Sequence, residues 1–164
     1  MKEIVDIKFA KVHPNAIIPS KRDEDMGFDI YACFDEDYMA INPHETKLIP
    51  TGIASSCDSN YGFVLRERGS TGSKGIALRA GVIDSGYRNE WFVGLTNTTN
   101  DRVYISKLNK EEHGVYSLVY PYSKAIAQAL IVPVPKTEVK EISYEELKAI
   151  ESERGMGALG SSNK

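Results

Sequence analysis

The stretch Arg68–Gly75, RGSTGSKG, combines small residues with hydroxyl groups and two cations, a composition suited to holding a phosphate. Small residues let backbone N–H groups approach an anion closely, hydroxyls donate to its oxygens, and Arg68 and Lys74 supply charge. Gly/Ser surface loops are common, however. Taken alone, this stretch is therefore more often such a loop than a phosphate site.

A second stretch, Gly81–Arg88, places Asp84 beside a tight turn and Tyr87 three residues further on. A carboxylate within hydrogen-bond reach of a water can act as its general base, and the tyrosine adds an aromatic face to the same pocket. An aspartate taken singly is more often a turn residue that accepts local backbone N–H bonds.

Two further segments carry charge near glycine. Asp25 and Asp29 flank Gly27 and suit Mg²⁺, which prefers one or two carboxylates together with water and substrate phosphates. Near the C-terminus, Arg154 and the paired serines 161 and 162 lie among glycines and could fold over a terminal phosphate. The plainer alternatives are a solvated acidic turn for the first segment and an unstructured chain end for the second.

These segments, with an Ala127-Gln128 pair, follow one another in an order that resembles the trimeric dUTPase family. The series is DxGxD, an Arg-Gly/Ser loop, GxIDxxY, Ala-Gln and a Gly-rich tail with an arginine, from about residue 25 to the last few residues. Five ordered matches within one domain are specific, whereas any single one is weak.

The resemblance implies an all-β, jelly-roll-like barrel subunit of the dUTPase β-clip type. It also implies a threefold homotrimer whose active sites combine motifs of all three chains. The implied reaction is hydrolysis of dUTP to dUMP and pyrophosphate, which limits uracil in DNA and supplies dUMP for dTMP synthesis. Asp84 would be the catalytic base that activates water for attack on the α-phosphorus. Tyr87 would pack beneath the deoxyribose, and the segment from Leu78 to Gly81 would read the uracil edge through main-chain groups.

The same resemblance implies roles around the phosphates. Arg68, Gln128 and either Gly69 or Ser70 would bind phosphate oxygens, and Asp29 would orient water on a Mg²⁺ cofactor. Such chemistry depends on positioning and charge neutralisation more than on a protein nucleophile. Residues 154–164 would form a flexible, Gly-rich lid over the γ-phosphate, with the substrate contacts Arg154, Leu159, Ser161 and Ser162.

Several positions depart from the family pattern. The usual Gly-acid-Arg before the Ala-Gln pair reads Ser123-Lys124-Ala125, so an arginine is missing. Lys124 and Arg88 are the candidates to replace its charge. Leu159 stands where an aromatic residue usually stacks on uracil, and Asn89 stands where a glycine is usual.

Strand-like runs dominate the chain and must position these segments. Apolar and polar residues alternate over Glu3–Lys11, as in a half-buried strand. Turn residues separate further β-like runs at Phe28–Cys33, Thr46–Ile49, Gly62–Arg66, Trp91–Leu95, Arg102–Ile105, Tyr116–Val119 and Ala127–Val134. Many short strands with few helical stretches favour an all-β barrel or a double-sheet jelly roll.

One short helix and one insertion complete the expected layout. Ser143 followed by Glu146 is a capping-box pattern ahead of strong helix formers. Residues 97–124 hold several tyrosines and no recognised motif, and they suggest an extra hairpin or a long loop. This segment resembles the insertions of phage-type family members, in which an extra element can bind another protein. We therefore predict a β domain over residues 1–153 with an insertion at 97–124, followed by the lid.

Composition excludes several other classes of protein. The 164 residues carry a formal net charge of −3, without the basic excess typical of nucleic-acid binders. Two isolated cysteines, Cys33 and Cys57, form neither a disulfide framework nor a metal site. Charges and prolines interrupt the N-terminal stretch, which lacks a signal-peptide core and the ~18–20 apolar residues of a membrane span. We therefore expect a cytoplasmic protein with no membrane partner.

Two other functions compete with dUTP hydrolysis. A dCTP deaminase, or its bifunctional form, shares the fold but would need a glutamate at the nucleobase end, where this chain has Arg79. The nearest glutamate, Glu90, lies on the far side of Asp84. A weakly active nucleotide-binding regulator would tolerate the altered motifs but has no need of the retained catalytic and phosphate-binding residues. We therefore predict dUTP hydrolysis.

Overall fold

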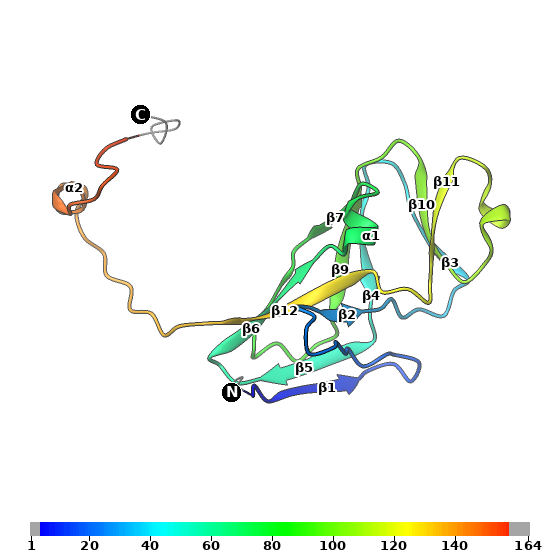
Figure 1. Cartoon of the computed structure of the whole chain (residues 1–164), viewed down its shortest axis with the longest axis horizontal. Helices are drawn as coiled ribbons and strands as arrows, with labels where there is room; N and C mark the ends of the chain where they lie inside the picture. The colour runs from blue at the N-terminus through cyan, green and yellow to red at the C-terminus, as the bar shows by residue number, and fades with distance from the viewer. Residues whose placement is uncertain (1–3, 158–164) are drawn as a thin grey trace. The chain divides into compact units, whose positions relative to one another are not determined.

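The computed structural model describes residues 4–157, and the chain divides into two compact units, Met1–Val134 and Pro135–Lys164. The first unit ends earlier than the predicted boundary at Glu153, because the last strand of the sheets ends at Pro133. Within the described residues this unit holds twelve strands (Figure 1): β1 Ile7–Lys11, β2 Phe28–Ile30, β3 Tyr38–Ile41, β4 Thr46–Pro50, β5 Ile53–Cys57, β6 Tyr61–Arg66, β7 Ile76–Arg79, β8 Val82–Ile83, β9 Phe92–Asn97, β10 Arg102–Ser106, β11 Ser117–Pro121 and β12 Ala127–Pro133.

The four-stranded sheet β2-β12-β6-β8 carries several of the predicted site residues at or beside its strands. All of its pairings are antiparallel, and β12 lies between β2 and β6 in Figure 1. Along β12, Ala127 and Ala129 are fully buried, whereas the intervening Gln128 is partly exposed. This alternation turns every second side chain of β12 away from the core and toward the surface.

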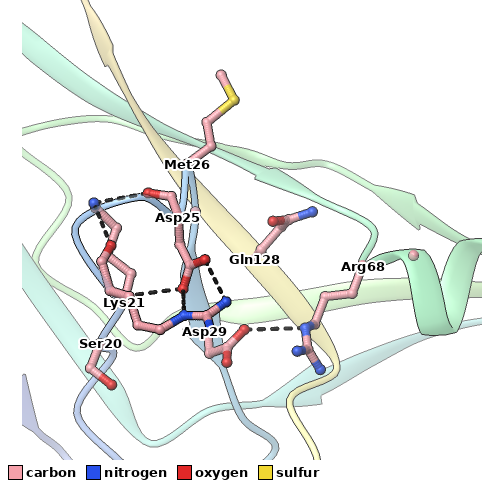
Figure 2. A pocket seen from close by; sticks show the side chains of 10 residues that line it. Ser20, Lys21, Asp25, Met26, Asp29, Arg68 and Gln128 are labelled. Carbon is pink, nitrogen blue, oxygen red and sulfur yellow. Dashed lines mark hydrogen bonds and ion pairs between the residues drawn. The ribbon is translucent and has the colours of Figure 1, made fainter.

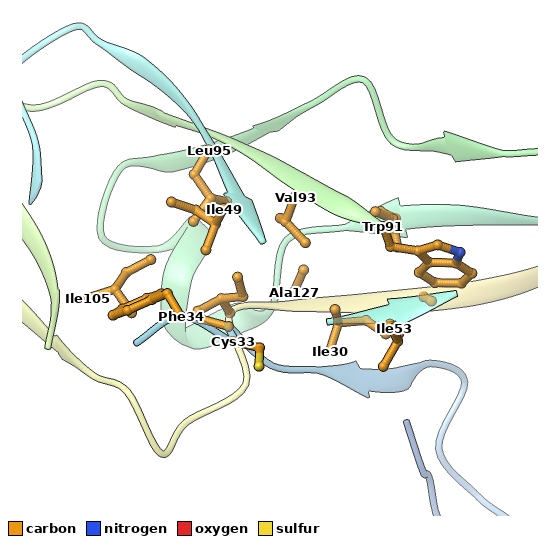
Figure 3. Packing of buried hydrophobic residues seen from close by; sticks show 14 of the residues in the cluster. Ile30, Cys33, Phe34, Ile49, Ile53, Trp91, Val93, Leu95, Ile105 and Ala127 are labelled. Atoms are coloured by element: carbon orange, nitrogen blue, oxygen red, sulfur yellow. The ribbon is translucent and has the colours of Figure 1, made fainter. Parts of the chain in front are cut away.

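The core lies between this sheet and the sheets β4-β9-β7 and β1-β5. Trp91, immediately before β9, is fully buried, and its ring centroid lies 5.0 Å from that of Phe63 and 5.6 Å from that of Phe9. Its indole N–H donates to Ser55 Oγ at 3.2 Å, so the buried polar group is satisfied. Figure 3 shows Trp91 packed beside Ile53 and Ile30, from strands far apart in the sequence.

Of the two alternatives for residues 97–124, an extra hairpin or a long loop, the hairpin does not form between β10 and β11, because these strands pair in parallel. Parallel neighbours cannot be joined by a tight turn, and the chain crosses back through a short 3₁₀ helix, η1 (Lys110–His113). His113 holds this crossover in place: its ring stacks on Tyr104 at 4.2 Å, and its Nε2 lies 2.7 Å from Ser106 Oγ. The other edge of β10 pairs antiparallel with β3, giving the order β11-β10-β3.

Two short α-helices lie in different units. Helix α1 (Gly69–Gly72) occupies the Gly/Ser stretch after β6, which the sequence suggests is a loop. In the second unit, α2 (Tyr144–Ala149) begins at the predicted capping box, in which Glu146 N donates to Ser143 Oγ at 3.1 Å. The predicted short helix near the C-terminus is therefore confirmed.

Other expectations concern the cysteines and the membrane. Both cysteines are free, and burial raises the pKa of each thiol. Within residues 4–157, no helix has the length and apolar character that a bilayer span requires.

Candidate active site

A polar pocket of about 590 Å³ lies where β2, β12 and the end of β6 meet, shown in Figure 2. Its walls carry three cations and two carboxylates, which leaves one positive charge in excess. The lining residues are Ser20, Lys21, Arg22, Asp25, Met26, Gly27, Asp29, Arg68, Gly69 and Gln128. Such a pocket suits a polyanion better than an apolar ligand.

Sheet register brings the predicted phosphate residues together. Gln128 of β12 pairs with Asp29 of β2 on one side and with Arg66 of β6 on the other. Directly paired residues in antiparallel strands project to the same face. Asp29 and Gln128 therefore share a face of the sheet, and Arg68 follows two residues after the end of β6.

Arg68 is held firmly at the mouth of this pocket. Its Nε lies 3.1 Å from Asp29 Oδ1, and its Nη1 donates to the carbonyl of Ala125 at 3.2 Å. Beside it, Gln128 Nε2 donates to the carbonyl of Glu67 at 2.8 Å. A guanidinium fixed by one partner in β2 and another just before β12 is pre-organised to receive an anion.

Gly27 has a steric reason to be glycine. A Cβ at this position would lie 2.7 Å from Gln128 Oε1 and 3.0 Å from Gln128 Cβ. Any side chain at residue 27 would therefore push Gln128 out of its place in the pocket. The glycine of the DxGxD segment thus leaves room for the Gln128 side chain on the neighbouring strand.

Two cations that no sequence motif indicates, Lys21 and Arg22, also line the pocket, just before the acidic segment. Arg22 donates from Nε and Nη2 to the two carboxylate oxygens of Asp25, each at 2.8 Å. Side-chain hydrogen bonds from Arg22, followed by one from its backbone N–H, lower the pKa of Asp25 to about 2. Lys124 and Arg88, the predicted substitutes for the missing arginine, are not among the lining residues.

Replacing Arg22 with alanine should raise the pKa of Asp25 from about 2 toward ~3.9, the ordinary value for an aspartate. The ionised Asp25 carboxylate is favoured by the pair and is protonated only as the pH falls through about 2, so the variant should protonate at higher pH. Carboxyl ¹³C NMR over a pH titration measures this. Lys21→Ala is the matched control and should move the value less, because the Lys21 charge is the smallest cause. An unshifted Asp25 in Arg22→Ala would contradict the pairing.

Gly69 and Ser70, the two alternatives for the second motif, point to different surroundings. Gly69 lines the pocket, and a Cβ there would meet no atom within 4 Å. The Ser70 hydroxyl instead lies 2.6 Å from the hydroxyl of Tyr120 on β11. The residue at the pocket therefore has no side chain, and the residue with a hydroxyl contacts another strand.

The remaining predicted residues of the first unit form a second cluster around the turn between β7 and β8, two strands that belong to different sheets. Ala80 takes a left-handed conformation at the turn with φ of 52°, and a Cβ on Gly81 would lie 2.6 Å from the carbonyl oxygen of Leu65. Leu78 and Gly81 line a smaller pocket of about 220 Å³. Asp84 and Tyr87 follow β8 in an exposed turn closed by a hydrogen bond from Tyr87 N to Asp84 O at 3.1 Å.

Within the second cluster, Asp84 and Tyr87 lie apart from the polar pocket, whereas Leu78 N donates to Glu67 Oε1 at 2.9 Å, next to Arg68. The pairing of Ile83 with Phe63 sets Asp84 near the start of β6, whereas Arg68 lies beyond the end of that strand. Five or six residues of extended strand separate such positions by about 15–20 Å. Asp84 and Tyr87 are accordingly absent from the walls of the polar pocket.

The predicted lid residues belong to the second unit or lie outside the described residues. Arg154 lies in the second unit, after α2. Leu159, Ser161 and Ser162 lie outside the described residues. Among residues 4–157, no group of three or more His, Cys, Asp or Glu side chains could hold a metal ion by itself.

Known proteins share both the sequence and the fold. The dUTPase family model matches residues 13–110. The deoxyuridine 5'-triphosphate nucleotidohydrolase of Nautilia profundicola is 36% identical over 162 residues, covering 96% of this chain and 99% of that protein. A mutant Staphylococcus bacteriophage 80alpha dUTPase, solved with dUpNHpp, has a TM-score of 0.75 and 25% identity, covering 96% of this chain and 98% of that one.

Another structural relative is described with a bound metal ion. A mutant dUTPase from phage phi11 of S. aureus, described with a structural Mg(II) ion, has a TM-score of 0.67 and 20% identity. The match covers 85% of this chain and 99% of the phage phi11 chain. These likenesses confirm the predicted jelly-roll β fold. On the extent of the sequence matches, the chain belongs to the dUTPase family.

Proposed function

We propose that this protein hydrolyses dUTP to dUMP and pyrophosphate as a cytoplasmic enzyme, limiting uracil in DNA and supplying dUMP. The observation that carries the proposal is the polar pocket, in which Arg68, Gln128 and Asp29 meet on one face of a sheet. Family membership supplies the reaction, and the pocket offers the donors and charge that a triphosphate needs.

Asp84 is the proposed general base at the nucleoside end. Its carboxylate takes the proton of a water as that water attacks the α-phosphorus, and pyrophosphate leaves. Tyr87 packs beneath the deoxyribose, where its ring leaves no room for a ribose 2′-hydroxyl. Leu78 and Gly81 present main-chain groups to the uracil edge, and the close approach of Gly81 to Leu65 supports a tightly held turn between β7 and β8.

Five side chains are proposed to serve the phosphates. Arg68 and Gln128 donate to phosphate oxygens, and Lys21 and Arg22, in place of Lys124 and Arg88, supply the charge of the missing arginine. When bound, Mg²⁺ neutralises triphosphate charge and polarises the phosphoryl oxygens. Asp29 fits that ion through water, because its ion pair with Arg68 uses Oδ1 and Oδ2 can accept from a metal-bound water.

A homotrimer with shared sites would join the two clusters. The base and the β7–β8 turn of one chain would face the polar pocket of a neighbour, which accounts for the separation of Asp84 from Arg68 along β6. Arg154, Leu159, Ser161 and Ser162 would close over the γ-phosphate as a lid.

Residues 97–124 are further proposed to bind another protein. Unchanged activity and unchanged interactions after removal of residues 108–119 would contradict that role.

Ending the chain after Glu153 should lower kcat about ten-fold or more while raising KM less, because a lid excludes water and aligns the phosphates at the reacting stage. Steady-state kinetics with dUTP checks this. A chain lacking only Lys164 is the control. If the shortened protein keeps its full kcat, the lid role is wrong.

Gly69→Ser should lower KM for dUTP by about five-fold, because the new hydroxyl has open space in the pocket and can donate to a phosphate. Gly69→Ala is the matched control, since it adds the Cβ without the hydroxyl and should leave KM near that of the unmodified protein. Equal KM values for both variants would mean that residue 69 does not face the phosphates.

The proposed function is tested by pyrophosphate release from dUTP, UTP, dTTP and dCTP in parallel, with Mg²⁺ present. Turnover of dUTP alone would support the reaction, the sugar selection and the base selection together. Ammonia released from dCTP would indicate a deaminase, and binding of dUTP without turnover would indicate a regulator.

A further inference from the structure

We infer that residues 97–124 hold the Arg68–Gly75 phosphate loop in its binding geometry, with Tyr120 as a positioning residue. The inference rests on the proposed function, because it assigns a role in that reaction to a segment without a catalytic motif. Figure 1 shows α1 of this loop beside the β11-β10-β3 sheet.

Tyr120 carries the main contact. Its side chain is only 4% exposed, and its hydroxyl lies 2.6 Å from Ser70 Oγ on α1. The ammonium of Lys74, at the other end of the same loop, lies 5.7 Å from the centroid of the Tyr120 ring. A buried ring thus meets the loop at two positions, once through a hydrogen bond and once through a cation–π contact.

The beginning of the segment holds the end of the loop. Thr98 donates to the carbonyl of Gly75 twice, from its hydroxyl at 2.6 Å and from its backbone N–H at 2.9 Å. Gly75 has φ of 79°, and a Cβ there would collide with Thr99 Cγ2 at 2.8 Å. Residues near both ends of the 97–124 segment, Thr98 and Tyr120, therefore contact the loop.

The loop needs outside support because its own sequence provides little. Helix α1 is four residues long and begins and ends with glycine, so it cannot be stable in isolation. Yet Arg68 and Gly69 at its start line the polar pocket. If the loop is not already ordered, part of the free energy of phosphate binding is used to order it, and the affinity for the nucleotide falls.

The expected kinetic signature is a change in KM. The loop contacts phosphates in the substrate as well as in the transition state, and loss of such uniform binding raises KM without lowering kcat. Asp84 follows β8, near the opposite end of β6 from the loop, so loosening the loop leaves the base in place.

The test compares Tyr120→Phe, Ser70→Ala and the double variant with the unmodified protein. Each single change should raise KM for dUTP about three- to ten-fold with kcat within about two-fold, as expected for loss of one buried hydrogen bond. The double variant should match the single variants, because both remove the same interaction. Tyr116→Phe is the matched control, since Tyr116 lies in the same segment but is 85% exposed, and its KM should not change.

Hydrogen exchange of amides 68–75 gives a second readout that needs no activity. Exchange should be faster in Tyr120→Phe and Ser70→Ala than in Tyr116→Phe, while thermal midpoints show that every variant folds. Unchanged exchange together with unchanged KM in Tyr120→Phe would overturn the inference, as would additive effects in the double variant. If the unmodified protein releases no pyrophosphate from dUTP, the proposed function fails, and exchange alone still decides whether Tyr120 holds the loop.

Discussion

Asp84→Asn should lower kcat for dUTP by about 10²–10⁴-fold while KM changes little, because an asparagine amide cannot take the proton of the attacking water. The change preserves the size of the side chain, and the turn depends on the Asp84 backbone carbonyl, which accepts from Tyr87 N. Steady-state kinetics and equilibrium binding of dUMP together separate lost turnover from lost binding.

Asp37→Asn is the matched control for Asp84→Asn. Asp37 is an exposed aspartate just before β3, and its loss should not affect turnover. Full activity in Asp84→Asn would rule out Asp84 as the base and would leave the exposed turn after β8 without a proposed chemical role.

Arg68→Ala should lower kcat/KM for dUTP by about 10²–10³-fold, because it removes a charged phosphate donor and leaves Asp29 without its ion-pair partner. Arg66→Ala removes a nearby guanidinium that does not line the pocket and serves as the control. Equal loss in both variants would point to general charge attraction instead of a specific contact.

Mixing the two inactive variants tests whether sites are shared. If one chain supplies Asp84 and its neighbour supplies Arg68, trimers co-assembled from equal amounts of Asp84→Asn and Arg68→Ala regain about one quarter of the normal activity. Each site then has about a one-half chance of receiving an intact Asp84 from one chain and about a one-half chance of receiving an intact Arg68 from its neighbour. A site built within one chain would regain nothing, because every chain carries one defect. Light scattering should give three times 18.2 kDa for the assembly.

The part of the candidate site that lines the polar pocket can be predicted from sequence because its residues lie in short motifs with a recognisable order. Asp29, Arg68 and Gln128 were assigned through the family resemblance, and the register of β2, β12 and β6 gathers them in one pocket. Lys21 and Arg22 were missed because a charged pair beside an acidic run looks like an ordinary solvated turn. Only the fold shows that this turn forms one wall of the pocket.

Other features depend on contacts between distant residues and leave no local pattern. The sequence IASSC of β5 contains small and polar residues typical of a loop, yet Ile53, Ala54 and Ser55 are buried, and the indole N–H of the buried Trp91 donates to Ser55 Oγ. The parallel pairing of β10 and β11 depends on the crossover held by His113. The orientation of Ser70 likewise depends on Tyr120, fifty positions away along the chain.

The fluorescence emission of Trp91 can be used to follow the folding of the first unit. It is the only tryptophan of the chain, and its indole is fully buried against Phe63 and Phe9. Emission should therefore shift to longer wavelength when the core opens to water and remain constant when nucleotide enters the surface pocket. Excitation of that single ring gives an unlabelled denaturation curve for each variant above, reporting residues 1–134 without any contribution from tryptophan in the second unit.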